Sequence, residues 1–338
     1  MPGSPMSRTP LDGVSLVLAD LDGVIYKGPA AIPYAVESMN AIAAPTRVAY
    51  ITNNASRTDA SVAQHLTELG LHAAAEDIVT SPQAAMTLLK ELVAPGSSIL
   101  VVGGDGLVDE VTKAGFTVTR SALDNPAAVV QGFSPEVGWV HLAEAAFALN
   151  GDGTAGDLPW VATNTDWTIP QARGTAPGNG TLVSAVHTAV GRLPVVAGKP
   201  EVAIFEEAMT RFGTRDALMI GDRLDTDILG ANRAGIPSVL VLTGIDRAKQ
   251  VIAAVPQERP TYILDDLRQL HEPYPETVVT EAPGVTRTTV GSATVRREGG
   301  AITIESGSGV DLLRAGAAAI WNSGAAIYAL DVPAELYS

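Results

Sequence analysis

The sequence contains no cysteine and has few basic side chains for its length. The absence of cysteine excludes disulfides, thiolate metal sites and thiol nucleophiles. Only 22 lysine and arginine residues stand against 37 aspartate and glutamate residues, which gives a formal net charge of −15. Nucleic acids and anionic membranes both require clustered basic residues, so we expect neither as a partner. An anionic substrate would need a bound metal or a few well-placed cations.

Long apolar runs are also absent. No stretch approaches the roughly 18 apolar residues of a membrane span. The first 13 residues lack the apolar core of a secretory signal. We therefore expect a cytoplasmic protein. The 338 residues, 46% of them hydrophobic, predict two or three domains at about 150 residues each.

The first chemical motif follows an apolar run near the N-terminus. Residues 16–19 predict a buried strand, and Asp20 and Asp22 come directly after it, followed by Gly23. Ligands of open α/β sheets bind at the carboxyl ends of strands. A lone acidic turn is ordinary, because Asp and Gly are common turn residues. The other strand ends therefore decide how this motif is interpreted.

Three further polar clusters follow predicted strands. Thr52-Asn53-Asn54 is suited either to a phosphoryl group or to a helix N-cap. Lys199 lies between Gly198 and Pro200, where a lone lysine is more often a solvated charge. The segment from Gly221 to Asp227 contains three aspartates, and their mutual repulsion favours a hard divalent cation nearby. Helix capping explains only part of that last cluster.

The segment between the second and third clusters reads as a smaller α/β unit. It ends in the polar stretch 163–167 and a glycine-rich loop at 174–181. That loop has no lysine, which excludes a P-loop. Beyond residue 270 the pattern changes. We expect a strand over 285–296, a hairpin turn at Gly299-Gly300, a strand over 301–305, a helix over 310–321 and a strand over 325–330.

With all four clusters in order, residues 14–270 resemble the haloacid dehalogenase (HAD) superfamily of phosphatases, and within it the type-IIA, NagD-like branch. The resemblance implies an α/β fold: a doubly wound, Rossmann-like core with an inserted α/β cap domain. A small C-terminal α+β module follows. The expected boundaries are 1–84 and 184–270 for the core, 85–183 for the cap and 271–338 for the module. The branch often has Gly-Leu-Asp in the cap where this chain has Gly132-Phe133-Ser134, so contacts there are not carried over.

The resemblance also implies residue roles. Asp20 is the expected nucleophile and Asp22 the general acid and base. Mg²⁺ is expected on Asp20, the Asp22 carbonyl and Asp222, with Asp227 behind them. Thr52, the Asn53 backbone and Lys199 are expected to bind the phosphoryl oxygens.

The substrate expectation depends on charge. Residues 85–183 hold ten acidic and four basic residues, a balance of −6, which disfavours substrates with a second anionic group. Glycerol 3-phosphate is the first choice, with hydroxyl contacts from Asn164 and Asp166. Phosphoglycolate and pyridoxal phosphate are the alternatives, and Arg173 is the candidate for a substrate carboxylate. A homodimer through the cap is a further expectation. Outside enzymes, the rivals are a receiver-type phosphoacceptor and a binding protein on the same fold.

Overall fold

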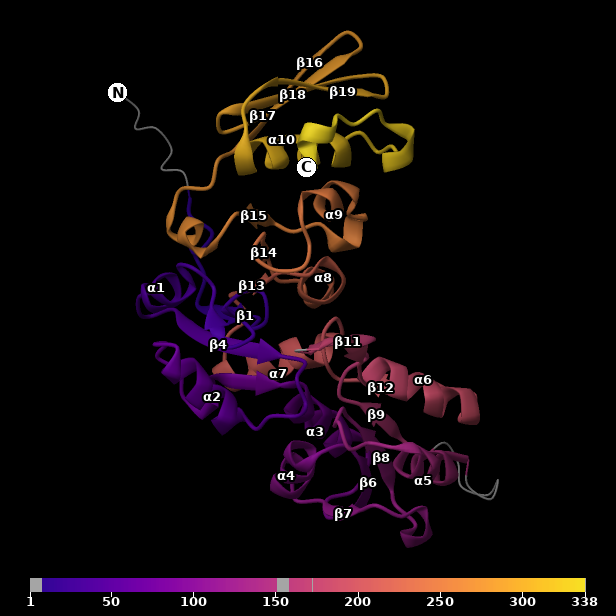
Figure 1. The fold of residues 1–338 in the computed structure, drawn as a ribbon. Coiled ribbons are helices and arrows are strands. Elements are labelled where there is room, and N and C mark those ends of the chain that lie inside the picture. The colour runs from indigo at the N-terminus through magenta and orange to yellow at the C-terminus, as the bar shows by residue number, and fades with distance from the viewer. Residues whose placement is uncertain (1–7, 151–157, 172, 338) are drawn as a thin grey trace. The chain divides into compact units, whose positions relative to one another are not determined.

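The structure is a computed structural model that describes residues 8–150, 158–171 and 173–337. The chain divides into two compact units, Met1–Val48 together with Thr214–Ser338, and Ala49–Gly213 (Figure 1). The helices of the described residues include none that is long and apolar enough to cross a membrane.

The first unit contains parallel strands in the order β15-β14-β13-β1. Leu16 lies opposite Ala217 and Ala19 lies opposite Ile220, so β1 and β13 end side by side. Near-continuous apolar runs form these strands because both faces of a parallel sheet are covered. The elements are β1 (Leu16–Ala19), β13 (Ala217–Gly221), β14 (Ser238–Val241), β15 (Tyr262–Leu264), α1 (Ala35–Asn40), α8 (Leu229–Ala234), α9 (Ala248–Ala253) and the hairpin β2 (Tyr26–Lys27) with β3 (Ala30–Ala31).

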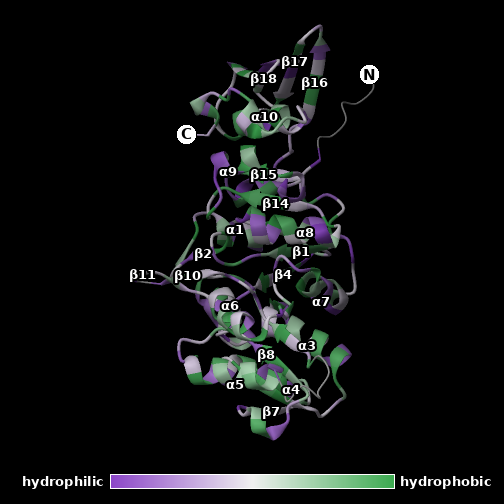
Figure 2. Ribbon diagram, turned by 90° about the vertical axis from the view of Figure 1, so that its right-hand side faces the viewer, coloured by the Kyte–Doolittle hydropathy of each residue, from purple (hydrophilic) through white to green (hydrophobic). Residues whose placement is uncertain are grey.

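The C-terminal part of this unit is an antiparallel meander with one helix. The helix is hydrophobic along much of its length and packs on β17 and β18 (Figure 2). Its Leu313 and Ile320 share one apolar cluster with Val251 and Ile263, so the module and the parallel sheet have a common core. The elements are β16 (Thr277–Ala282), β17 (Val285–Val290), β18 (Ala293–Glu298), β19 (Ala301–Ser306) and α10 (Gly309–Trp321).

Two predictions for this part were wrong. The expected single strand over 285–296 is two strands, which are joined at Gly291 with φ of +53°. A two-residue hairpin turn keeps the alternation of side chains, so the pattern alone does not reveal the break. The expected strand over 325–330 is instead a 3₁₀ turn, Ile327–Ala329, in which Tyr328 is exposed. Ile327 and Leu330 pack against the apolar cluster at a spacing of three residues, which places both on one side of a 3₁₀ turn but on opposite faces of a strand.

The second unit contains a five-stranded parallel sheet in the order β12-β9-β8-β6-β7. An apolar cluster on one face includes Val129 and Trp160 of the sheet, Ala145 of α5 and Val183 of α6. The elements are β6 (Ser98–Val102), β7 (Thr117–Thr119), β8 (Ala128–Gln131), β9 (Trp160–Ala162), β12 (Val195–Val196), α4 (Asp105–Lys113), α5 (Trp139–Asn150), α6 (Asn179–Val190) and the hairpin β10 (Thr168–Gln171) with β11 (Gly174–Pro177).

The same unit also holds a parallel pair and three helices. Strand β4 pairs with β5 so that Thr52, the last residue of β4, lies opposite Thr80. Helix α3 packs against both α7 and α4. The elements are β4 (Arg47–Thr52), β5 (Ile78–Thr80), α2 (Asp59–Glu68), α3 (Ser81–Leu92) and α7 (Val202–Phe212). The predicted α/β class with parallel sheets is confirmed. The two compact units divide the chain at other positions and do not test the predicted domain boundaries. The boundaries 1–84, 85–183, 184–270 and 271–338 therefore stay a prediction.

Candidate functional site

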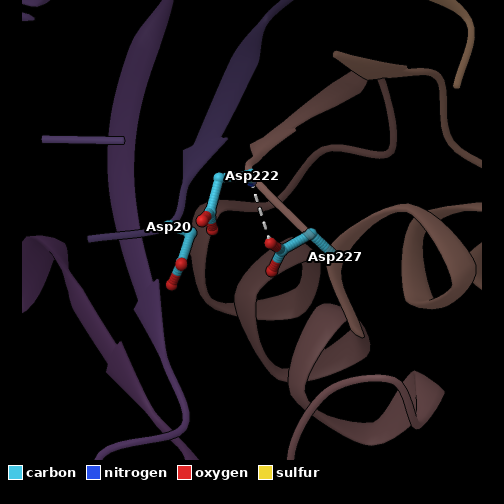
Figure 3. A group of neighbouring side chains, drawn as sticks. All are labelled: Asp20, Asp222 and Asp227. Carbon is cyan, nitrogen blue, oxygen red and sulfur yellow. Dashed lines mark hydrogen bonds between the residues drawn. The ribbon is translucent and has the colours of Figure 1, made fainter. Parts of the chain in front are cut away.

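Three aspartates gather in the first unit at the ends of β1 and β13 (Figure 3). Asp20 follows β1 directly, and its backbone N–H donates to the Ile220 carbonyl at 2.8 Å. Asp222 follows β13, which runs parallel to β1 in register. Neighbouring parallel strands therefore deliver both carboxylates to the same edge of the sheet. One carboxylate oxygen from each of Asp20, Asp222 and Asp227 lies within 4.8 Å of the others.

Asp227 is held by the turn that follows β13. It is fully buried, and its Oδ2 accepts hydrogen bonds from the backbone N–H groups of Asp222 and Arg223, each at 3.1 Å. A side chain at Gly221 would overlap the Asp227 carboxylate, so glycine is required at that close approach. The structure thus places Asp227 among the three carboxylates, with one oxygen fixed by the backbone. Its expected role behind the metal ligands stays a prediction.

Two glycine-containing loops enclose the Asp222 carboxylate, which is 2% exposed. A Cβ atom at either Gly23 or Gly244 would collide with it. Its Oδ2 accepts a hydrogen bond from the Ile245 N–H at 2.7 Å. The Thr243 hydroxyl donates to the Gly23 carbonyl at 2.7 Å, which ties the two loops together. The Asp222 carboxylate is therefore held in place by close packing against both loops and by the hydrogen bond from Ile245.

The three carboxylates fit a hard divalent cation. Carboxylate oxygens are the ligands that Mg²⁺ and Ca²⁺ prefer, and such a cation would offset the repulsion between neighbouring anions. Arg223 forms a bidentate pair with Asp225 at 2.7 and 2.9 Å, and this pair lies at the surface. The Asp22 side chain is exposed and outside the carboxylate group, so its expected metal contact would come from the backbone carbonyl.

Asp246 supports the same turn and was missed by the sequence reasoning. Its Oδ2 accepts a hydrogen bond from the Leu224 N–H at 2.7 Å, and its own N–H donates to the Asp222 carbonyl at 3.1 Å. Burial raises the pKa of the Asp246 carboxyl, and the bond from Leu224 opposes this shift. The signal in the sequence was a Thr-Gly-Ile-Asp loop directly after a buried strand.

The second unit brings together the predicted phosphate-binding residues. Thr52 and Asn53 follow one another at the end of β4, and all three of Thr52, Asn53 and Lys199 are at least nine-tenths buried. The Asn53 side chain pairs with the Lys199 backbone: Oδ1 accepts from the Lys199 N–H at 2.8 Å, and Nδ2 donates to the Lys199 carbonyl at 3.0 Å. The Thr52 hydroxyl accepts from the Asn54 N–H at 3.1 Å.

The two polar residues expected to contact substrate hydroxyls lie in this same cluster. Asp166 Oδ1 accepts a hydrogen bond from Asn53 Nδ2 at 3.1 Å. The Asn164 side chain is 4% exposed, donates to the Asn53 carbonyl at 2.8 Å and accepts from the Asp166 N–H at 3.2 Å. Asn164 thus contacts the protein through both ends of its amide. Substrate contacts by Asn164 and Asp166 stay a prediction.

Three other positions are placed as follows. Arg173 is exposed in the turn between β10 and β11, so its role toward a substrate carboxylate stays a prediction. Ser134 stands where the NagD-like branch often has aspartate, and its hydroxyl oxygen accepts a hydrogen bond from the Glu136 N–H at 3.3 Å. Asn179, which the sequence reasoning did not single out, opens α6 and donates to the Asn164 carbonyl at 2.7 Å. Its only sequence signal was its place in the glycine-rich loop.

The chain matches two protein-family models and is similar to several known phosphatases. The family model described as haloacid dehalogenase-like hydrolase matches residues 17–117, and a second described as HAD-hydrolase-like matches residues 196–270. The chain is 46% identical over 312 residues to the D-glycerol 3-phosphate phosphatase of Mycobacterium tuberculosis, covering 92% of this chain and 86% of that protein. It is 33% identical over 258 residues to the acid sugar phosphatase of Staphylococcus aureus, covering 75% and 95%.

The fold is also similar to solved structures of proteins of this kind. Glycerol phosphate phosphatase from M. tuberculosis in complex with magnesium matches with a TM-score of 0.81 and 42% identity, over 94% of this chain and 93% of that chain. NagD from Escherichia coli matches with a TM-score of 0.67 and 30% identity, over 75% and 97%.

Proposed function

The chain belongs to the haloacid dehalogenase-like hydrolases, and on that premise we propose that it is a Mg²⁺-dependent phosphatase that hydrolyses glycerol 3-phosphate to glycerol and phosphate. The observation that carries the proposal is the group of three carboxylates at the ends of β1 and β13. The 46% identity to a D-glycerol 3-phosphate phosphatase supports both the reaction and the substrate.

The proposed reaction has two steps. A carboxylate oxygen of Asp20 forms a bond to phosphorus while the ester P–O bond breaks, and Asp22 gives its proton to the departing alkoxide. Water then attacks phosphorus, Asp22 takes a proton from this water, and the Asp20 carboxylate is released with inorganic phosphate. Mg²⁺ held by Asp20, Asp222 and the Asp22 carbonyl would supply charge stabilisation for the phosphoryl group.

Thr52, the Asn53 N–H and Lys199 are assigned to the remaining phosphoryl oxygens. A buried lysine is rare unless its charge has partners, because removing an ammonium group from water costs several kcal/mol. The 4% exposure of Lys199 therefore favours a functional role over that of a solvated surface charge. Asp227 is assigned to support the metal ligands.

Charge in the cap segment favours a neutral alcohol over an acid as the leaving group. Two of its four cations are already engaged by the protein: Lys113 pairs with Asp109 at 2.7 Å, and Arg120 donates to the Gly103 carbonyl at 2.9 Å. A substrate carboxylate left without a cation in a closed site costs several kcal/mol. Glycerol 3-phosphate needs only hydrogen bonds for its glycerol part, which Asn164 and Asp166 are assigned to provide.

A panel of phosphate esters tests the substrate assignment. Phosphate release with Mg²⁺ would be measured for glycerol 3-phosphate, phosphoglycolate, pyridoxal phosphate and a sugar phosphate. We expect the highest kcat/KM for glycerol 3-phosphate. A tenfold higher value for phosphoglycolate or pyridoxal phosphate would overturn the substrate assignment, and release of no more than one phosphate per chain would favour the phosphoacceptor or binding-protein alternative.

We further infer a cytoplasmic homodimer that associates through the cap. Helix α5 exposes Trp139, Val140 and Phe147 at 77%, 64% and 59%, and Leu123 nearby in the sequence is 89% exposed. Such a concentration of exposed apolar side chains is typical of an interaction surface. Light scattering on protein eluted from a size-exclusion column would give the mass of the particle in solution. We expect the mass of a dimer for wild type and the mass of a monomer for Phe147→Lys.

A further inference from the structure

We propose that Asn53 is a positioning residue: its side-chain amide fixes the backbone of Lys199 and thereby the place of the Lys199 ammonium group. The proposal rests on the phosphatase function and on the phosphate-binding role of Lys199. It concerns the Asn53 side chain, which is separate from the role that the resemblance implies for the Asn53 backbone.

The contact between the two residues is a two-point amide pairing. Asn53 Oδ1 accepts from the Lys199 N–H at 2.8 Å, while Nδ2 donates to the Lys199 carbonyl at 3.0 Å. Because the backbone N–H can only donate and the carbonyl can only accept, this pairing also settles which amide atom is oxygen. Two bonds to one residue fix both the position and the orientation of its backbone, as a single bond would not.

The neighbouring glycine makes this pairing possible. A Cβ atom at Gly198 would lie 2.5 Å from Asn53 Oδ1 and 2.6 Å from the Thr163 carbonyl oxygen. Any other residue at position 198 would push the loop away from Asn53. The segment from residue 198 to residue 199 is therefore seated directly against the Asn53 amide.

Asn53 is itself fixed by other buried polar groups. Its carbonyl accepts hydrogen bonds from the Ser81 hydroxyl and from Asn164 Nδ2, both at 2.8 Å. Asn179 at the start of α6 donates in turn to the Asn164 carbonyl at 2.7 Å. A series of buried amides thus connects α6 to Lys199 through Asn53. The Asn53 and Asn164 amides of this series are paired at both their oxygen and their nitrogen atoms, and satisfied buried groups of this kind restrict side chains to a single arrangement.

The consequence for catalysis follows from the flexibility of lysine. Its ammonium group lies at the end of a four-carbon stem, so an unfixed backbone would spread the charge over many positions. Fixing the Lys199 backbone reduces the range of positions that the ammonium group can occupy before the substrate binds. A misplacement of about 1 Å near a reacting group costs on the order of 100-fold in rate. The Asn53 amide is therefore expected to raise the reaction rate by holding the Lys199 ammonium group in place.

A double-mutant cycle tests the proposal in the full-length protein. Asn53→Ala keeps the backbone and removes the amide, and we expect kcat/KM for the best substrate of the panel to fall about 10- to 100-fold. The inhibition constant of inorganic phosphate should rise by about tenfold. In the background of Lys199→Met, the same change should cost less than threefold, because its effect passes through Lys199.

Asn232→Ala is the matched control. The Asn232 amide also donates to two backbone carbonyls, those of Gln257 and Arg259 at 2.8 and 3.1 Å, but in the first unit. It should lower stability while leaving kcat/KM and the phosphate inhibition constant within twofold of wild type. This separates positioning from a general loss of stability.

Two results would overturn the proposal. One is an Asn53→Ala protein whose kcat/KM stays within threefold of wild type. The other is a double variant whose loss equals the product of the two single losses, since Asn53 would then act independently of Lys199. A wild-type protein without Mg²⁺-dependent turnover would instead contradict the phosphatase function itself, so the two failures are distinguishable.

Discussion

At the scale of single residues, two aspartates three positions apart in one turn have opposite environments. Asp222 is 2% exposed and accepts a hydrogen bond from the Ile245 N–H. The Asp225 side chain is 59% exposed and pairs with Arg223 at the surface. Exposed ion pairs contribute little to stability or binding. Of these two aspartates, Asp222 lies in the group of three carboxylates that fits a metal ion, and Asp225 does not.

Metal dependence of activity distinguishes these two residues. Asp222→Asn removes a charged ligand, and we expect the Mg²⁺ concentration for half-maximal activity to rise at least about tenfold. Asp225→Asn should leave it within twofold. The measurement is a Mg²⁺ titration of phosphate release for wild type and both variants. Equal shifts in the two variants would show that general negative charge in the turn, and not ligation by Asp222, controls metal binding.

The sequence predicted which side chains gather but not how they are oriented. Asp20 and Asp222 were predictable because each follows a buried strand directly, and parallel strands in register end together. The pairing of Asn53 with Lys199 was not, because it joins loops 146 residues apart through two specific hydrogen bonds. Asp246 was missed for the same reason, since its role depends on a contact with Leu224 across two loops.

At the scale of elements, the parallel strands were predictable and the C-terminal segment was less so. Uninterrupted apolar runs such as 16–19 and 217–220 are characteristic of buried parallel strands. Over 285–296 the alternation continues through a glycine turn, so two strands appeared as one. Over 325–330 an apolar composition suggested a strand, but the chain forms a 3₁₀ turn there and meets β19 at an isolated bridge between Asp331 and Ala301.

The 3₁₀ turn Leu267–His271 shows how one acid stabilises an element. Asp266 Oδ1 accepts from the Arg268 N–H at 2.9 Å, and Oδ2 accepts from the Arg268 guanidinium at 2.7 Å. The hydrogen bond from the Arg268 side chain is the main cause that lowers the pKa of the Asp266 carboxyl below 3.8. A folded-state pKa below the unfolded value gives stability that is present above pH 3.8 and is lost as the pH falls through the folded-state pKa.

Asp266→Asn therefore has a pH-dependent effect. Asparagine keeps the ability to cap the turn but removes the charge, so we expect a loss of roughly 0.5–1 kcal/mol in unfolding free energy at pH 7. The difference from wild type should shrink as the pH falls below 3.8. Urea unfolding at pH 7 and at acid pH checks this. A constant difference across that range would show that the charge of Asp266 does not stabilise the fold.

At the scale of the whole molecule, the C-terminal module is part of the first unit. Residues of α10 share an apolar cluster with α9 and β15, so deleting 275–338 would expose that cluster to water. The four motifs all precede residue 271, so the chemistry itself is expected to survive such a deletion. A deletion would confuse loss of folding with loss of function, and a point substitution separates them.

Arg314 is the residue to change. It is 7% exposed and its guanidinium donates to the Ile263 carbonyl at 2.8 Å, to Asp311 at 2.9 Å and to Gln269 at 3.1 Å. Arg314→Met would leave buried polar groups unpaired, and we expect unfolding free energy to fall by about 3 kcal/mol. The value of kcat should be unchanged while the protein is folded. Arg268→Met, at an exposed ion pair, is the matched control and should cost less.

An altered kcat in folded Arg314→Met protein would show that the module contributes to catalysis. Unfolding would be followed by circular dichroism in urea, and kcat would be measured well below the unfolding midpoint. A loss no greater than that of Arg268→Met would contradict the view that Arg314 joins the module to the sheet.

The central claim is that Asp20 is the nucleophile of a Mg²⁺-dependent phosphatase. The most direct measurement is kcat for glycerol 3-phosphate with Mg²⁺ in wild type and in Asp20→Asn, with folding checked by circular dichroism. An amide in place of the carboxylate keeps the shape of the side chain but removes the attacking oxygen anion, so we predict a loss of at least about 1,000-fold with the fold intact. Asp20→Asn activity within tenfold of wild type would contradict the account.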